Sequence, residues 1–166
     1  MTTQNDAMTD PRIREAATMI PVYGQLPFVP ERASGCDIFT RDGRQILDLY
    51  GGHAVAALGY GHPSLVEAIH TQSSKLLFQS NAVALDIRAD AAEKLTQVAP
   101  NGIDRVFFVN SGAEANENAL RMALRATGRS KVLAIKMGFH GRTAAAGAVT
   151  WNADKWYGFP SRPFDV

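Results

Sequence analysis

Apolar side chains recur every three to four residues in several stretches of the chain, which predicts amphipathic helices over residues 63–76, 86–98 and Glu114–Thr127. The first helix begins near Pro63, because proline suits the first helical turn. The second begins near Asp86, whose side chain is a candidate cap, and ends before Pro100. A shorter helix is expected at Pro11–Thr18.

Shorter apolar runs predict β-strands. Alternating segments at Asp37–Thr40 and Gln45–Leu49 flank an Asp42-Gly43 step, which indicates a β-hairpin at residues 37–49. Two further runs, Arg105–Val109 and Val132–Ile135, lie on either side of the third helix. The order strand, helix, strand favours an α/β fold with a mostly parallel sheet, in which these two strands are neighbours.

The turn between the first of these runs and the following helix reads Asn110-Ser111-Gly112-Ala113. The unpaired N–H groups and the dipole of a helix N-terminus favour an anion there. The turn also suits an ordinary cap made by Ser111 or Asn110, and that reading stays open. The sequence contains neither GxGxxG nor GK[ST], so this turn is not a dinucleotide fingerprint or a Walker A loop.

The second apolar run leads into a loop that reads Gly138-Phe139-His140-Gly141-Arg142. Phe139 offers a ring for stacking on a flat heterocycle, an interaction worth about 1 kcal/mol beyond burial. Arg142 offers a planar fork for a carboxylate, although it equally suits a surface ion pair. His140 is either a ligand-binding or an ordinary loop histidine. The two loops together suit a ligand with a phosphate, a flat ring and a carboxylate.

Composition narrows the function classes. The 17 Lys and Arg residues balance 16 Asp and Glu, which argues against a nucleic-acid or membrane partner. The single cysteine, Cys36, excludes an internal disulfide and is interpreted as a small buried strand residue. His53, His62 and His70 lie in different local contexts and show no metal-ligand spacing. Without a long apolar run or a signal-peptide pattern, we expect a cytoplasmic protein.

At 166 residues the chain is long enough for one ordinary domain with a core. Its last residues, however, follow directly after Trp151, Trp156, Tyr157 and Phe159, which have no later element to pack against. The chain is therefore expected to be the front portion of a larger protein.

The run NSGAEANENALRMAL followed by GFHGRT closely resembles the class III, pyridoxal-phosphate-dependent aminotransferases, and within them the acetylornithine and succinylornithine branch. The segments PVYGQLPFVPERASG, DGRQILDLYGGHAVAALGYGHP and LFQSN agree, so that the resemblance covers about residues 21–160. It implies a fold-type I transferase with a mostly parallel sheet and flanking helices, a homodimer, and pyridoxal 5'-phosphate as cofactor. It also implies a small-domain segment at 21–80 and the first part of the large domain at 81–166. Residues 1–20, before the resemblance begins, are expected to form a mobile arm.

The resemblance also assigns roles to residues. Gly112 and Ala113 are expected to hold the cofactor phosphate through their amides, with Ser111 beside them. Phe139 is expected to stack on the pyridine ring, with His140 adjacent. Two substrate-side residues follow from it: Arg142 for the amino acid's carboxylate, and Asn81 with its neighbours at the cavity entrance of the partner subunit. His53 and Tyr60 depart from the residues common in relatives, so the substrate stays open.

The implied reaction moves the amino group of N-acetylornithine or succinylornithine to 2-oxoglutarate, in arginine metabolism. Other class III donors, 4-aminobutyrate or ornithine, an aminomutase, and a non-catalytic fragment that binds phosphate or a partner remain alternatives. The family's Schiff-base lysine is expected beyond Val166, and no lysine of this chain has that lysine's sequence context. No catalytic residue is therefore assigned, and the chain alone is expected to be inactive.

Overall fold

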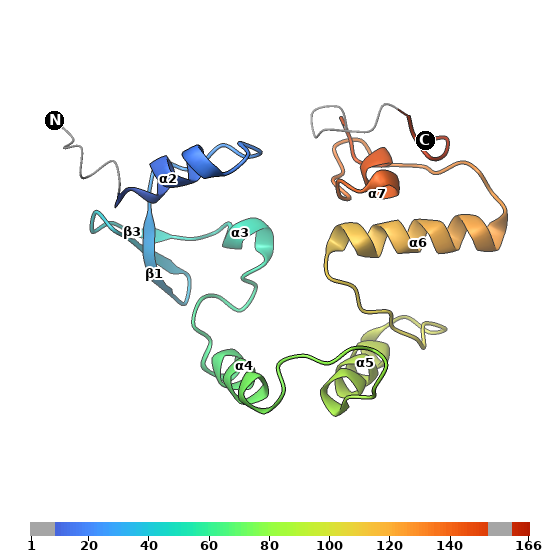
Figure 1. Cartoon of the computed structure of the whole chain (residues 1–166), viewed down its shortest axis with the longest axis horizontal. Helices are drawn as coiled ribbons and strands as arrows, with labels where there is room; N and C mark the ends of the chain where they lie inside the picture. The colour runs from blue at the N-terminus through green and yellow to red at the C-terminus, as the bar shows by residue number, and fades with distance from the viewer. Residues whose placement is uncertain (1–8, 153–160) are drawn as a thin grey trace. The chain divides into compact units, whose positions relative to one another are not determined.

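The computed structural model describes residues 9–152 and 161–166 of the chain (Figure 1). They belong to two compact units, Met1–Val83 and Ala84–Val166. Among the described residues, the first unit holds a small antiparallel sheet and three helices, and the second unit holds three helices. Trp156, Tyr157 and Phe159, which were predicted to lack a later element to pack against, lie outside the described residues.

The sheet of the first unit consists of β1 (Pro30–Ser34), β2 (Asp37–Thr40) and β3 (Gln45–Leu47), in the order β1-β2-β3. Both pairs are antiparallel, and Ile38 on β2 faces Ile46 on β3. The predicted β-hairpin is thus confirmed, although β3 ends at Leu47 rather than Leu49. In its turn the Thr40 hydroxyl contacts Asp42 and accepts a 3.0 Å hydrogen bond from the Arg44 amide.

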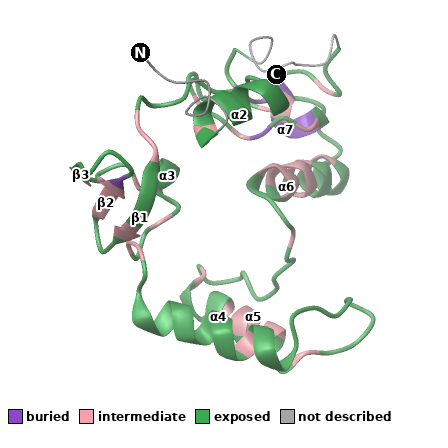
Figure 2. Cartoon of the chain, turned by 60° about the vertical axis from the view of Figure 1, so that its left-hand side comes forward, coloured by how far each residue is buried: buried purple, intermediate pink, exposed green. Residues whose placement is uncertain are grey.

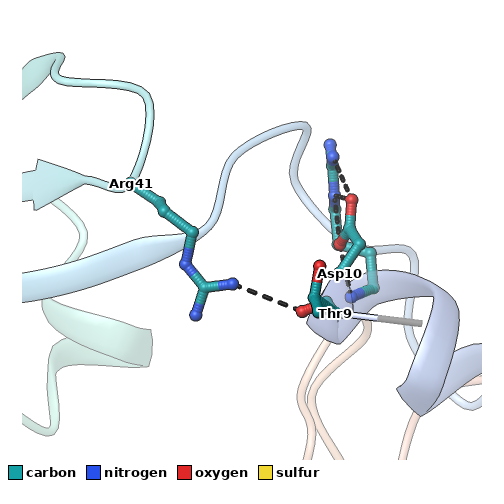
Figure 3. A network of polar contacts seen from close by, with 4 residues as sticks. Thr9, Asp10 and Arg41 are labelled. Atoms are coloured by element: carbon teal, nitrogen blue, oxygen red, sulfur yellow. Dashed lines mark hydrogen bonds and ion pairs between the residues drawn. The ribbon is translucent and has the colours of Figure 1, made fainter. Parts of the chain in front are cut away.

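Two predicted helices of the first unit are confirmed as α2 (Pro11–Thr18) and α4 (Pro63–Lys75). Asp10 caps α2 by accepting a 2.9 Å hydrogen bond from the Arg12 amide, as is usual for an aspartate at this position. The segment before α2 meets the hairpin turn, where Arg41 Nη1 donates to the Thr9 carbonyl over 3.4 Å (Figure 3). This contact connects the start of α2 with the sheet.

Between the sheet and α4 lies α3 (Gly51–Ala54), a turn with left-handed backbone. Its φ angles are 56° at Gly51, 58° at Gly52, 60° at His53 and 63° at Ala54. Glycine adopts such angles without penalty, whereas each L-residue pays roughly 1–2 kcal/mol for them. The turn therefore holds backbone strain at His53 and Ala54.

The helices of the second unit are α5 (Asp86–Val98), α6 (Gly112–Thr127) and α7 (Ala144–Ala148). The first two confirm the prediction, with α6 beginning two residues before the expected Glu114. The prediction that Asp86 caps α5 is wrong, because Leu85 occupies the N-cap position and Asp86 is the first helical residue. α7 was not predicted. This helix and its C-cap Val149 carry the buried apolar residues of the described part of this unit (Figure 2): Ala145, Ala146, Ala148 and Val149.

The strands expected at Arg105–Val109 and Val132–Ile135 do not form among the described residues. A strand needs a hydrogen-bonded neighbour, and these two runs do not pair with each other as predicted. Among the described residues, the second run is joined to Asp165 by a parallel bridge at Lys131, in which the Val132 amide donates a 2.9 Å hydrogen bond to the Asp165 carbonyl. Two of its large apolar residues, Leu133 and Ile135, are 93% and 81% exposed. The predicted parallel sheet is therefore not built from the described residues alone.

One expectation about packing is wrong. Cys36 is exposed in the turn between β1 and β2, and is not a buried strand residue. None of the helices in the described ranges is both long and apolar enough to cross a membrane.

Candidate functional site

The N-terminus of α6 has donors for an anion. Ser111 is the N-cap, and its Oγ accepts a 3.1 Å hydrogen bond from the Glu114 amide. Glu114 Oε2 in turn accepts a 2.6 Å bond from the Asn110 amide. This reciprocal arrangement is close to a capping box. The amides of Gly112 and Ala113 have no acceptor inside the helix, because they belong to its first turn. Two such amides are groups to which an anion can hydrogen-bond.

The loop 138–142 lies against the first turns of α6. Asn116 Nδ2 donates to the His140 carbonyl over 2.7 Å. Gly141 is buried with φ 135°, and a Cβ atom built on it would lie 2.6 Å from Ala113 Cβ. Only glycine allows this approach, because any side chain at this position would clash with α6. The turn and the loop that sequence reasoning singled out are thus brought together in one unit.

Thr150 holds the same loop from its other side. Its side chain is buried, and its Oγ1 accepts a 2.9 Å hydrogen bond from the His140 amide. The same hydroxyl lies 3.0 Å from the carbonyl oxygens of Gly141 and Ala146, to which it donates. Sequence reasoning missed Thr150, because a threonine ten residues beyond His140 has no local pattern that marks it.

Glu117 connects α6 with α7. Its Oε2 accepts hydrogen bonds from Thr143 Oγ1 at 2.7 Å, the Ala145 amide at 2.7 Å and the Ala146 amide at 3.1 Å. Burial opposes ionisation of this carboxyl, but these donors outweigh burial and hold its pKa below the usual value. Sequence reasoning missed this residue also, since its partners lie on a helix that was not predicted.

The predicted site residues differ in exposure and in location. Ser111 and Gly112 are exposed and Ala113 is half-buried at the start of α6. On the loop, the Phe139 side chain is 54% exposed, His140 is half-buried and Arg142 is exposed. These six residues share the second unit, whereas Asn81 is exposed and belongs to the first unit.

A second polar cluster lies in the first unit around Asp48. Its carboxylate accepts 2.9 Å hydrogen bonds from the amides of Tyr50 and Gly51, and a 2.5 Å bond from the Tyr60 hydroxyl. The Tyr60 hydroxyl, followed by the two amides, holds the pKa of Asp48 below its usual value. The cluster lies at an apolar cavity of about 770 Å³ that Leu26, Phe28, Ile38 and Ile46 also line. It fixes the loop that contains the left-handed turn α3.

Curated proteins similar to this chain are transaminases. The chain is 41% identical over 130 residues to a [LysW]-aminoadipate semialdehyde transaminase from Deinococcus radiodurans, covering 78% of this chain and 30% of that protein. It is 39% identical over 154 residues to an acetylornithine aminotransferase from Vibrio cholerae, covering 89% of this chain and 38% of that protein. The chain thus spans about a third of the length of these relatives.

Solved transaminase structures share the fold. An omega transaminase from Pseudomonas jessenii in complex with PMP matches 95% of this chain and 38% of its own, with a TM-score of 0.82 and 26% identity. A taurine:2-oxoglutarate aminotransferase from Bifidobacterium kashiwanohense, in complex with PLP and glutamate, matches 86% of this chain and 33% of its own, with a TM-score of 0.78 and 27% identity.

These neighbours confirm the predicted fold type, that of the pyridoxal-phosphate-dependent transaminases. The family model named "Aminotransferase class-III" matches residues 19–162, which is most of the chain. The chain therefore belongs to the class III aminotransferases, whose cofactor is pyridoxal 5'-phosphate.

Proposed function

We propose that this protein takes part in an enzymatic transamination, which transfers the amino group of N-acetylornithine or succinylornithine to 2-oxoglutarate. The observation that carries the proposal is the contact between the α6 N-terminus and the 138–142 loop, in a chain of this family. The choice of donor is supported by several relatives at 37–42% identity that are named acetylornithine aminotransferase.

The residues at this contact fit the cofactor. The first-turn amides of α6 provide two donors for a phosphate, and a Cβ atom at Gly112 would meet no atom within 4 Å, so that space for the phosphate is open. Phe139 is 54% exposed, and an aromatic ring of this kind can stack on a pyridine. When bound, pyridoxal phosphate supplies the electron sink that transamination requires.

In this proposal each residue of the site binds or orients. Gly112 and Ala113 donate their amides to the phosphate, and Ser111 lies beside them as the cap of α6. Phe139 covers one face of the ring, with His140 next to it on the same loop. Arg142 pairs with a carboxylate of the amino donor, which suits its planar, bidentate guanidinium.

A second candidate substrate comes from the relative named [LysW]-aminoadipate semialdehyde transaminase, which is 41% identical to this chain. Its named substrate is an aldehyde, which accepts an amino group. Ornithine and 4-aminobutyrate remain further candidates within the family. His53 and Tyr60 bear on this choice, since both lie on the loop fixed by Asp48. A donor panel separates these candidates.

The proposal extends to assembly and place of action. We infer a homodimer in the cytoplasm, acting in arginine metabolism, in which Asn81 lines the cavity entrance of the partner subunit. Sedimentation of the cross-linked and untreated protein tests the dimer, and Asn81→Cys provides a cross-linking position. A chain that stays monomeric at all concentrations would contradict this part.

The donor is tested in a chimera in which residues 19–162 replace the matching segment of the Vibrio cholerae acetylornithine aminotransferase. We expect glutamate formation with N-acetylornithine at a kcat/KM at least tenfold above that with ornithine or 4-aminobutyrate. A preference for one of the other donors would overturn the assignment. The unaltered Vibrio enzyme is the control.

We further propose that the 166-residue chain alone does not transaminate. None of the chain's lysines lies in the sequence context of the family's cofactor lysine: Lys75, Lys94, Lys131, Lys136 and Lys155. A transaminase needs such a lysine as its base. An assay with pyridoxal phosphate, N-acetylornithine and 2-oxoglutarate measures glutamate. Glutamate production faster than that by free pyridoxal phosphate would show that one of the chain's own lysines acts as the base.

A further inference from the structure

The carboxylate of Glu117 collects three donors from a single short segment. Thr143 is the N-cap of α7, and Ala145 and Ala146 follow in its first turn. All three donate to the same oxygen, Glu117 Oε2, at 2.7–3.1 Å. The donors lie 26 to 29 residues away in sequence, so this is a tertiary contact between α6 and α7.

This contact supplies what α7 lacks by itself. α7 has five residues, too few for a stable isolated helix. Its N-cap residue, Thr143, makes no side-chain cap of its own and instead donates to Glu117. A carboxylate at a helix N-terminus is favourable, because it meets unpaired amides and the positive end of the dipole. Glu117 therefore caps α7 from another helix.

Thr143, the N-cap residue of α7 that donates to Glu117, directly follows the 138–142 loop. The middle of that loop is held by Asn116, which donates to the His140 carbonyl, and by the Gly141–Ala113 approach. Asn116 and Glu117 are consecutive residues of α6. One turn of α6 thus holds both the middle of the loop and its C-terminal end.

We propose that Glu117 is a positioning residue, which fixes the 138–142 loop, and with it Phe139 and Arg142, against the α6 N-terminus by capping α7. This inference rests on the proposed function, because it gives the loop its role toward pyridoxal phosphate. Glu117 itself touches neither the phosphate amides nor the loop side chains in the contacts described above. Its effect on ligand binding therefore passes through the backbone of the loop.

Amide hydrogen exchange of the 166-residue chain tests the positioning without any ligand. The variants are Glu117→Ala, Glu117→Gln, which keeps the shape but not the charge, and Glu93→Gln, which neutralises an exposed carboxylate on α5 as the control. We expect the amides of Ala145, Ala146 and His140 to exchange about tenfold faster in Glu117→Ala, with a smaller increase in Glu117→Gln. Glu93→Gln should match the wild type.

Ligand binding is measured with two probes, pyridoxal phosphate by equilibrium dialysis and inorganic phosphate by the NMR shift of the Gly112 amide. The Kd of pyridoxal phosphate should rise about tenfold in Glu117→Ala, because the ring loses its positioned partner on the loop. The Kd of inorganic phosphate should stay unchanged, because the first turn of α6 is intact. This difference separates positioning from general loss of structure.

Three outcomes overturn the proposal. Unchanged exchange at His140 would mean that Glu117 caps α7 without holding the loop. An unchanged Kd of pyridoxal phosphate in Glu117→Ala would mean that the loop position is irrelevant to the ligand. An equal loss of both probes would indicate only structural damage. A wild-type chain that binds phosphate but no pyridoxal phosphate would count against the proposed function, while hydrogen exchange would still decide on the positioning.

Discussion

At the scale of single residues, Asp48 and Tyr60 form the most direct pair to test. The folded pKa of Asp48 is lowered, first by the Tyr60 hydroxyl at 2.5 Å and then by two backbone amides. A lowered folded pKa means that the carboxylate stabilises the fold above its unfolded pKa of about 3.9, and that this stabilisation is lost as the pH falls through the folded pKa. Tyr60→Phe should therefore raise the pKa of Asp48, measured by carbon NMR titration of its carboxyl.

The control for this titration is Asp42. Its pKa is lowered by the Thr40 hydroxyl and by Arg44, neither of which contacts Tyr60 in the interactions described above. The pKa of Asp42 should be the same in Tyr60→Phe and wild type. If the pKa of Asp48 also stays unchanged, the amides of Tyr50 and Gly51 alone account for its shift.

Arg142 is the residue whose proposed role bears most directly on the substrate. In the chimera, Arg142→Ala should raise the KM for N-acetylornithine by about 30- to 150-fold, which corresponds to about 2–3 kcal/mol for a lost charge-assisted contact. Cofactor binding should change little. Arg142→Lys keeps the charge but loses the planar fork, so its KM should lie between that of Arg142→Ala and that of the unsubstituted chimera. Equal donor kinetics in all three proteins would make Arg142 a surface charge only.

At the scale of elements, the α6 N-terminus has a structural role as a helix cap and a proposed role in phosphate binding, and substitutions at Ser111 separate the two. Ser111→Ala removes the cap and should cost about 1 kcal/mol of unfolding free energy, measured by urea denaturation. Ser111→Asp retains a capping oxygen and should preserve stability. Its negative charge should nevertheless weaken phosphate binding, measured by the NMR shift of the Gly112 amide. Undiminished phosphate binding by Ser111→Asp would place the anion elsewhere.

At the scale of the whole molecule, many large apolar side chains are exposed within each unit. Leu49 is 89% exposed in the first unit, and Leu133 and Ile135 are 93% and 81% exposed in the second. Such surfaces promote association, especially along unpaired strand-like runs. We expect the purified chain to self-associate, and Leu133→Lys combined with Ile135→Lys to reduce this, measured by light scattering after gel filtration.

The matched control adds the same two charges at exposed polar positions, as Ser74→Lys with Gln97→Lys. This variant should associate as strongly as the wild type, because its apolar surface is unchanged. If both double variants become monomeric, added charge rather than lost apolar area is the cause, and the run at residues 132–135 is not the associating surface.

The sequence by itself determined the elements that local interactions stabilise. Helices α4, α5 and α6 follow from apolar periodicity, and the hairpin follows from its Asp-Gly turn. The local pattern before α6 left two candidate N-caps, Asn110 and Ser111, and in the structure Ser111 is the N-cap. The family could be recognised for the same reason, because its motifs are continuous runs of residues.

Only the tertiary structure decided the features that join distant parts of the chain. The apolar runs at Arg105–Val109 and Val132–Ile135 were predicted to be neighbouring strands, but they do not pair with each other. A strand forms only with a hydrogen-bonded partner, and the apolar content of a segment does not determine which segment that partner is. α7 depends on a carboxylate from α6, and the loop 138–142 depends on Asn116 and Thr150. These contacts link residues that are up to 29 positions apart, a distance over which no periodicity carries information.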